Sequence, residues 1–432
     1  MLKRFLQLAL HWQILIALVL AVVAGLITGK EMAILGVSFY QLYDFFGTLF
    51  LNALKMLIVP LIVSSIIVGM MGIGSGEALG RLGGKTLLYY ASTSLLAILI
   101  GLLVVNLMAP GIVDGQPARD MIGLSADVEQ VTNSIEGKGA GDIVSVFLRM
   151  VPANVVSAAA DGQMLGLIFF SLLFGYFLTR IGEPQATTLK NFWQGVLDVM
   201  MEITTWVMRF APLGVFALVA RVIASSGVEA FKPLAVFFFT VLIALALHLL
   251  VSLPLILRFI ARVSPRRHFQ AMAPALLTAF STSSSSATLP LTLDCVEQRA
   301  GVSNRVSSFT LPLGATVNMD GTALYECVAA MFIAQAYGLE LSFTTQFVIV
   351  LVALLTSIGV AGIPSASLVA ISIILAAIGL PMEAVGLILA VDRVLDMCRT
   401  AVNVFSDSVA AVVIARLEGE TEVLQPLPEN SV

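Results

Sequence analysis

One apolar segment near the C-terminus, residues 387–416, carries five polar or charged side chains. They follow one another at spacings of four, three, four and four: Asp392, Asp396, Arg399, Asn403 and Asp407. At roughly 100° per residue, a helix keeps all five within an arc of about 80°. A charge at the centre of a bilayer costs on the order of 3 kcal/mol or more, so this stripe cannot face lipid. The pattern predicts a membrane helix whose polar side faces the protein interior.

Two functions fit such a stripe. It can be a structural seam of salt bridges between helices, or it can be a binding site. A seam would balance its charges, but the stripe has three acids and one arginine. The unpaired acids favour a site for cations, together with a ligand group that pairs with Arg399.

The composition agrees with a membrane protein. The chain has 432 residues, of which 59% are hydrophobic and 12% charged, whereas soluble domains have about 25% charged residues. No basic stripe indicates nucleic acid as a partner. Cys295, Cys327 and Cys398 lie in or beside apolar segments, without the spacing of a disulfide framework or a metal site. The N-terminus lacks a convincing cleavage site for a signal peptide.

Long apolar runs predict the membrane-spanning helices. They cover residues 12–27, 39–71, 87–108, 143–179, 192–224 and 231–263. A polar, acidic insert at residues 111–142 is expected outside the cell, and the basic residues between spans are expected inside, which places both termini in the cytoplasm. The short acidic tail after Arg416 is expected to be loose.

Two regions of the last third are too interrupted to be ordinary spans. Serines and threonines at residues 281–288 divide the apolar run at 269–297, and glycines with Pro364 divide the run at 342–380. Each half of the first run has about a dozen residues, whereas a span needs about 20. Two short halves joined by a polar tip predict a re-entrant hairpin. A flexible linker, the alternative for a serine run, is disfavoured by the apolar residues on both sides.

Between these regions, Asn318, Asp320 and Thr322 stand at alternate positions. An intact helix would point Asp320 away from the other two. Convergence of the three needs an unwound segment, which Gly314 and Gly321 permit. The backbone carbonyls freed by such a break are oxygen ligands for a hard cation such as Na⁺.

Together these elements resemble the dicarboxylate/amino acid:cation symporter family. It includes archaeal aspartate transporters, bacterial glutamate/aspartate symporters and animal excitatory amino acid transporters. The resemblance covers nearly the whole chain, and its most specific parts are residues 281–288, 318–322, 362–364 and 392–407. It implies an all-α polytopic membrane protein with eight transmembrane helices, two re-entrant helical hairpins and inverted repeats. It also implies a homotrimer in the plasma membrane, surrounded by lipid, that imports L-aspartate or L-glutamate with Na⁺ by an elevator mechanism.

The resemblance further implies a division of the chain into a static scaffold and a mobile transport domain. The segments are 1–83, scaffold helices one and two; 84–110, transport-domain helix three; 111–142, extracellular loop; 143–226, scaffold helices four and five; 227–416, the rest of the transport domain with helix six, hairpin one, helix seven, hairpin two and helix eight; and 417–432, a cytoplasmic tail.

The family pattern also implies roles for single residues. Arg399 pairs with the side-chain carboxylate of the substrate, which suits a planar guanidinium. Asp396 accepts the α-ammonium group, and Asn403 and Ser285 hold the α-carboxylate. The pocket is completed by Ser284, Met319, Thr322, Gly362, Pro364 and Thr400. The second hairpin forms the lid.

Three Na⁺ sites are implied, with Na⁺ as the co-transported ion. The first comprises the Gly314 carbonyl, Asn318, the Asn403 carbonyl and Asp407. The second comprises Tyr90, Thr93, Ser94, Asn318 and Asp320. The third comprises backbone carbonyls near Thr316, Ser357, Ile358 and Val360. The chain departs from some relatives at Ser283, where some prokaryotic members carry arginine, and Arg393 is a candidate replacement for that charge.

Several alternatives stay open at this point. A C4-dicarboxylate substrate and coupling to protons are alternatives within the family, and an anion channel is one outside it. The family's dicarboxylate branch lacks acids matching Asp396 and Asp407, which favours an acidic amino acid. Aspartate and glutamate are not separated, because one methylene changes pocket contacts only modestly. An enzyme is not expected: Asp142, part of a motif resembling intramembrane aspartyl proteases, is better explained as a helix N-cap, and no histidine forms a serine-hydrolase motif.

Overall fold

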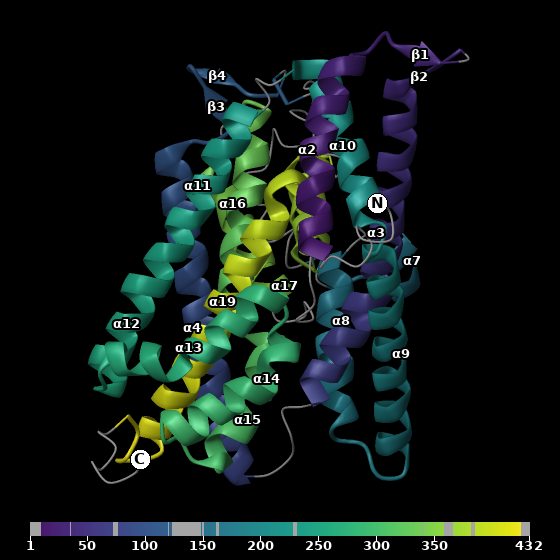
Figure 1. The fold of residues 1–432 in the computed structure, drawn as a ribbon. Helices are drawn as coiled ribbons and strands as arrows, with labels where there is room; N and C mark the ends of the chain where they lie inside the picture. The colour runs from purple at the N-terminus through teal and green to yellow at the C-terminus, as the bar shows by residue number, and fades with distance from the viewer. Residues whose placement is uncertain are drawn as a thin grey trace.

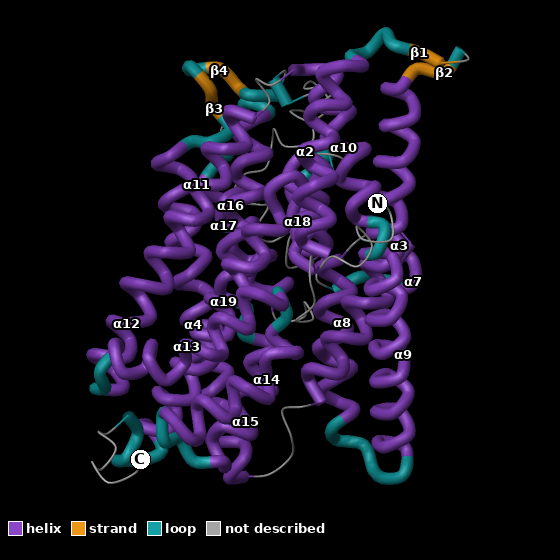
Figure 2. Tube along the Cα trace, in the orientation of Figure 1, coloured by secondary structure: helices purple, strands orange, loops and turns teal. Residues whose placement is uncertain are grey.

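The computed structural model describes residues 10–34, 36–71, 77–119, 121–122, 148, 151–160, 164–227, 231–339, 341–357, 366–381 and 385–424. Helices make up most of these residues, and two small strand pairs lie at one end of the molecule (Figures 1 and 2). The first pair joins β1 (Ala33–Ile34) to β2 (Val37–Ser38), and the second joins β3 (Ile112–Val113) to β4 (Gln116–Pro117). Both pairs are antiparallel. The last described residues of the chain lie at the opposite end (Figure 1).

The first group of helices comes from the N-terminal half. Its members are α2 (Leu10–Thr28), α3 (Phe39–Met71), α7 (Val155–Ala160), α8 (Met164–Leu178), α9 (Gln185–Met208) and α10 (Ala211–Ser226). Helix α10 packs against α2 and α3, and α3 packs against α8 and α9. The apolar region predicted at 192–224 contains most of α9 and α10, which meet at a bend of 54°. Pro212, the second residue of α10, has no N–H to continue the α9 hydrogen-bond ladder.

The second group lies beside the first in Figure 1. It consists of α4 (Glu77–Met108), α11 (Phe231–Leu247), η2 (His248–Ser252), α12 (Leu253–Ile256), η3 (Leu257–Ala261), α13 (Pro265–Thr282), α14 (Ser285–Asp294), η4 (Cys295–Arg299), α15 (Asn304–Val317), α16 (Asp320–Ala336), α17 (Phe343–Ser357), α18 (Ala366–Ile378) and α19 (Val385–Leu417). Helix α16 contacts α4, α11, α17, α18 and α19. Three described helical stretches are long and apolar enough to cross a membrane: Leu82–Met108, Phe231–Ala261 and Val391–Leu417.

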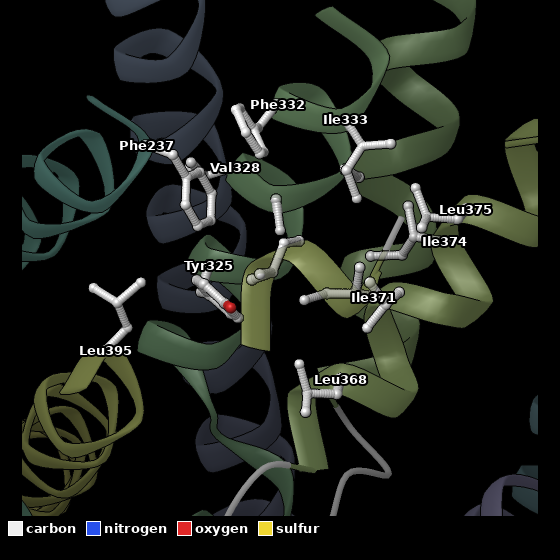
Figure 3. Close-up of a cluster of buried hydrophobic side chains, with 14 of the residues drawn as sticks. Phe237, Tyr325, Val328, Phe332, Ile333, Leu368, Ile371, Ile374, Leu375 and Leu395 are labelled. Atoms are coloured by element: carbon white, nitrogen blue, oxygen red, sulfur yellow. The ribbon is translucent and has the colours of Figure 1, made fainter. Parts of the chain in front are cut away.

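Helix α16 is the centre of this group, and nearly every residue in it is buried. Apolar residues occur on all its sides, as in a helix surrounded by others. Figure 3 shows its Phe332 beside Phe237 of α11, and their rings stack with centroids 4.6 Å apart. Ile371 of α18 and Leu395 of α19 belong to the same buried cluster. The core therefore encloses the N-terminal end of α16, where the polar residues lie.

Two pairs of short helices occupy the predicted hairpin regions. Helices α13 and α14 contact each other and are separated only by Ser283 and Ser284, with Ser283 in the left-handed conformation. Helices α17 and α18 also contact each other. Their connection falls outside the described residues, so the lid residues Ile358, Val360, Gly362 and Pro364 remain predictions.

The expectation of a loose tail is wrong for its first residues. Residues 418–424, here called the C-terminal strap, fold back onto the ends of several helices. Glu418 binds Lys85 of α4 at 2.7 Å and Arg305 of α15 at 3.2 Å. At its end, the Leu424 N–H donates to the carbonyl of Ala300 at 2.8 Å. Glu418, one of the acids that suggested a solvated tail, is thus held by basic residues more than a hundred positions away.

Candidate functional site

The predicted helix break lies at Asn318 and Met319. Helix α15 ends at Val317 and α16 begins at Asp320, and the two residues between them have φ/ψ of −106°/86° and −114°/60°. The break therefore exists, but its expected cause was wrong. Gly314 lies inside α15 and Gly321 inside α16, so neither supplies the unwound backbone.

The two glycines instead permit close packing. A Cβ on Gly314 would lie 2.5 Å from Asp407 Oδ1 and 2.8 Å from the Tyr90 hydroxyl. A Cβ on Gly321 would lie 2.8 Å from the Arg399 carbonyl oxygen. Real Cβ atoms do not approach other atoms so closely. Because these two glycines have no side chain, both halves of the broken helix can pack closely against α19.

Asp320 is wholly buried at the start of α16 and accepts hydrogen bonds from separate helices. Ser94 of α4 donates to Oδ1 at 2.7 Å, and Ser406 of α19 donates to Oδ2 at 2.5 Å. The Nε2 atom of His248, in η2, lies 3.1 Å from Oδ2. Three segments therefore meet at the Asp320 carboxylate: α4, α19 and η2, which is the π-helical extension of α11.

Asn318 joins this carboxylate to a second one. Its Nδ2 donates to Asp407 Oδ1 at 2.9 Å and to the Ser406 hydroxyl at 3.1 Å, while the Thr93 hydroxyl lies 3.4 Å from its Oδ1. The Tyr90 hydroxyl donates nearby to the Thr310 carbonyl at 2.7 Å. The structure therefore brings together the side chains that the family resemblance grouped as ligands of the first two Na⁺ sites.

Asp320 and Asp407 share a further property. Among the described residues, neither forms an ion pair with lysine or arginine. A buried charge without a partner is strongly unfavourable. Carboxylate, amide and hydroxyl oxygens are the donors that hard cations prefer. This cluster is therefore suited to bind a cation such as Na⁺.

Arg399 is the centre of a different cluster on α19. Its Nη1 donates to Asp392 Oδ1 at 2.9 Å and its Nη2 to Asp396 Oδ1 at 2.8 Å. The guanidinium carbon lies 3.9 Å from the ring centroid of Tyr325, a geometry for a cation–π interaction. Arg393 Nη1 also reaches Asp396 Oδ2 at 3.4 Å. These four charged residues all lie on α19, so among the described residues the stripe forms no seam of ion pairs between helices.

Other predicted pocket residues lie between the two clusters. Asn403 Oδ1 accepts from the Gly321 N–H at 2.8 Å, and its Nδ2 donates to the Thr322 hydroxyl at 3.0 Å. Thr400 donates to the Asp396 carbonyl at 2.8 Å, and Met319 is buried. Asn403 therefore fixes α19 to N–H groups in the first turn of α16, where a helix has no carbonyl partner for them.

The tip between α13 and α14 contributes serines. Ser284 caps α14, with its hydroxyl accepting from the Ala287 N–H at 3.2 Å. Ser285 and Ser283 are both buried. Helix α14 also contacts α19. Ile358 and Val360 lie outside the described residues, so the third Na⁺ site stays a prediction.

Sequence reasoning missed several buried polar residues around these clusters. They are His248, Ser406, Tyr325 and Glu326. The ion pair of Asp392 with Arg399 was also missed. Glu326 accepts from the Thr356 hydroxyl at 2.9 Å. A lone acid or histidine inside an apolar run was a detectable signal in the sequence. The partner of such a residue was not detectable, because His248 and Asp320, for example, are far apart in the chain.

Comparison with known proteins gives a consistent result. Residues 10–417 match the model of the sodium:dicarboxylate symporter family. A proton/sodium-glutamate symport protein of Bacillus caldotenax is 34% identical over 417 residues, which is 96% of each chain. The proton/glutamate-aspartate symporter of Escherichia coli is 34% identical, over 95% of this chain and 93% of the relative. Excitatory amino acid transporter 3 of Oryctolagus cuniculus is 37% identical, over 96% and 87% respectively.

Proposed function

The chain belongs to the sodium:dicarboxylate symporter family, and on this premise we propose that it is a symporter that imports acidic amino acids together with Na⁺. The observation that carries the proposal is the pairing of two buried clusters on α19. One holds an arginine that can bind a carboxylate, and the other holds Asp320 and Asp407 without lysine or arginine partners among the described residues. The site of action is the plasma membrane, with both termini in the cytoplasm.

The Arg399 cluster favours an amino acid over a plain dicarboxylate. Arg399 and Asp396 already form a buried pair at 2.8 Å. An amino acid with an acidic side chain can exchange with both members, because its carboxylate binds Arg399 and its ammonium binds Asp396. A dicarboxylate would take Arg399 and leave Asp396 without its strongest partner, which is costly in a buried site.

Competition for aspartate binding tests this choice. Radiolabelled aspartate is bound to the purified protein at saturating Na⁺, and glutamate or succinate is added as competitor. We expect L-glutamate to compete far better than succinate. Succinate competing as well as unlabelled aspartate would favour the dicarboxylate alternative.

The proton is a second candidate coupling ion, and Glu326 is the observation that favours it. This wholly buried acid follows Tyr325, whose ring covers Arg399. Its one oxygen accepts from Thr356 and the other has no hydrogen bond among the described residues. Uptake driven by a pH gradient without Na⁺ would support the proton, and loss of that uptake in Glu326→Gln would assign it to this residue.

The contacts between helices support a division into two units, as a homotrimeric elevator requires. We propose that α2, α3 and α8–α10 form the static scaffold within residues 1–83 and 143–226. Helix α4 and residues 227–416 form the transport domain. Helix α4 begins at Glu77, so this unit starts earlier than residue 84. The C-terminal strap binds α4, α13 and α15, which are all transport-domain elements, and therefore moves with them.

The strap gives a prediction about stability. The carboxylate of Glu418 is only 2% exposed between Lys85 and Arg305, both of which are partly solvated. We expect Glu418→Gln to lower the free energy of unfolding by about 1–2 kcal/mol, between the values for surface and buried ion pairs. Thermal unfolding in detergent measures it. Glu422→Gln, an exposed change in the same strap, is the control. Equal stability of both variants would contradict a structural role for the ion pairs.

A second prediction concerns the packing of Gly314. Its alanine variant places a methyl group against Asp407 and Tyr90 and should displace the Asp407 carboxylate. We expect Gly314→Ala to raise the Na⁺ concentration needed for half-maximal aspartate binding by roughly tenfold or more, as for other displaced metal-site groups. Gly84→Ala in α4 meets no atom within 4 Å and should behave as the unmodified protein. A normal Na⁺ requirement in Gly314→Ala would remove Asp407 from the cation site.

A further inference from the structure

His248 is buried inside a long apolar helix and has no place in the roles assigned above. It begins η2, a π-helical stretch that continues α11. Its side chain is 0% exposed, and so is that of its partner Asp320. Burying a polar ring is unfavourable unless it forms hydrogen bonds. Single π-helical turns inside α-helices occur frequently at functional sites. The position therefore needs an explanation beyond packing.

The hydrogen bonds to Asp320 are divided between its two oxygens. His248 and Ser406 both contact Oδ2, at 3.1 and 2.5 Å. Among the described residues, Oδ1 receives only the Ser94 hydroxyl, at 2.7 Å. Ser94 neighbours Thr93, whose hydroxyl approaches the Asn318 side-chain oxygen. Holding Oδ2 between two donors therefore turns Oδ1 toward the α4 side of the break, where the other oxygens lie.

The chemistry of the carboxylate fixes the direction of the histidine bond. An ionised carboxylate can only accept, so Nε2 of His248 carries the hydrogen that it donates. The other ring nitrogen, Nδ1, has no hydrogen bond among the described residues. A neutral donor orients the carboxylate without cancelling its negative charge. Lysine or arginine at this position would cancel it.

We infer that His248 is a positioning residue for the cation site at Asp320: its Nε2–H, with Ser406, holds Oδ2 so that Oδ1 is presented to the cation. His248 does not itself bind the ion. The inference rests on the proposed Na⁺ coupling. Carboxylates that bind metals are commonly held by such outer hydrogen bonds, and loss of one typically weakens metal binding by about 10–100-fold.

Side-chain geometry provides a sharp test. The amide nitrogen of glutamine can replace Nε2 of histidine, whereas that of asparagine reaches only as far as Nδ1. The measured quantity is the Na⁺ concentration for half-maximal binding of radiolabelled aspartate to the full-length protein. We expect His248→Asn to raise it by roughly tenfold or more, and His248→Gln to restore most of the difference. Aspartate affinity at saturating Na⁺ should stay the same in both, which also shows that both variants fold.

His268 offers a matched control. It is equally buried, and its Nε2 lies 2.9 Å from the hydroxyl of Ser408 rather than from a carboxylate. We expect His268→Asn to leave the Na⁺ requirement unchanged. The inference is overturned if His248→Asn has a normal Na⁺ requirement, if His248→Gln is no better than His248→Asn, or if His268→Asn has the same effect. Aspartate binding that ignores Na⁺ in the unmodified protein would overturn the proposed Na⁺ coupling as well, so the two failures are distinguishable.

Discussion

The Arg399→Cys variant should lose the binding of aspartate and glutamate. Arg399 is 1% exposed, and its guanidinium is the only cation paired with Asp392 among the described residues. Without it, the substrate's side-chain carboxylate would enter a buried site that already holds two acids. Removing one partner of a buried ion pair costs about 3–5 kcal/mol, which corresponds to binding weaker by roughly 100-fold to 1,000-fold or more. A neutral amino acid such as serine should gain competitive strength relative to aspartate.

Equilibrium binding of radiolabelled aspartate at saturating Na⁺ measures this effect. Arg399→Lys keeps the charge but not the planar pair of donors, so it should recover only part of the affinity. Arg393→Gln is the matched control, because Arg393 touches Asp396 only at 3.4 Å and should matter much less. Arg399→Cys leaves Asp392 buried without its partner, which could prevent folding. The double variant Arg399→Cys/Asp392→Asn removes that unpaired acid, so loss of aspartate binding in it is not explained by this cause. Aspartate affinity that is unchanged in Arg399→Cys would refute the assignment of the substrate site.

The second large effect is expected at the helix break. Asp320 and Asp407 are buried acids without lysine or arginine partners among the described residues. Acids at such depth are costly unless a cation neutralises them. Because coupling between two sites is reciprocal, Na⁺ and aspartate should each increase the affinity for the other. We therefore expect aspartate binding to rise with Na⁺ concentration with a Hill slope above one.

The variants Asp320→Asn and Asp407→Asn should each lower that slope or move the curve to higher Na⁺. The expected shift is roughly tenfold or more, since an amide lacks the charge of a metal-binding carboxylate. Asp198→Asn, on α9 of the other helix group, should leave the curve unchanged. Tight aspartate binding in choline chloride, without any response to added Na⁺ at constant pH, would contradict Na⁺ coupling through these acids.

The periodic features of the sequence were sufficient to predict the two elements that form the site. The spacing of Asp396, Arg399 and Asn403 predicted one polar side of a buried helix, which α19 has. Alternating polar residues predicted the break before Asp320. Both signals are local, because they depend on a helical repeat or on a few adjacent residues. The side chains grouped around Asn318 by family resemblance also converge in the structure.

Other features depend on contacts between distant parts of the chain. Gly314 and Gly321 suggested an unwound backbone, but they are needed because α19 passes too close for a Cβ. Glu418 suggested a solvated tail, but Lys85 and Arg305 hold it. Asp392 pairs with Arg399 across two helical turns, whereas Asp407 of the same stripe has no lysine or arginine partner among the described residues. Residue type and spacing cannot reveal such contacts, because the fold determines which distant segments meet.

Uptake of radiolabelled L-aspartate into proteoliposomes containing the purified protein tests the central claim most directly. Internal and external pH are held equal, and only the Na⁺ gradient is varied. We predict that an inward Na⁺ gradient drives aspartate to an internal concentration above the external one. Equal Na⁺ on both sides, or choline in its place, should abolish this accumulation. Aspartate that only equilibrates across the membrane, or that accumulates equally well without Na⁺, would contradict Na⁺-coupled symport.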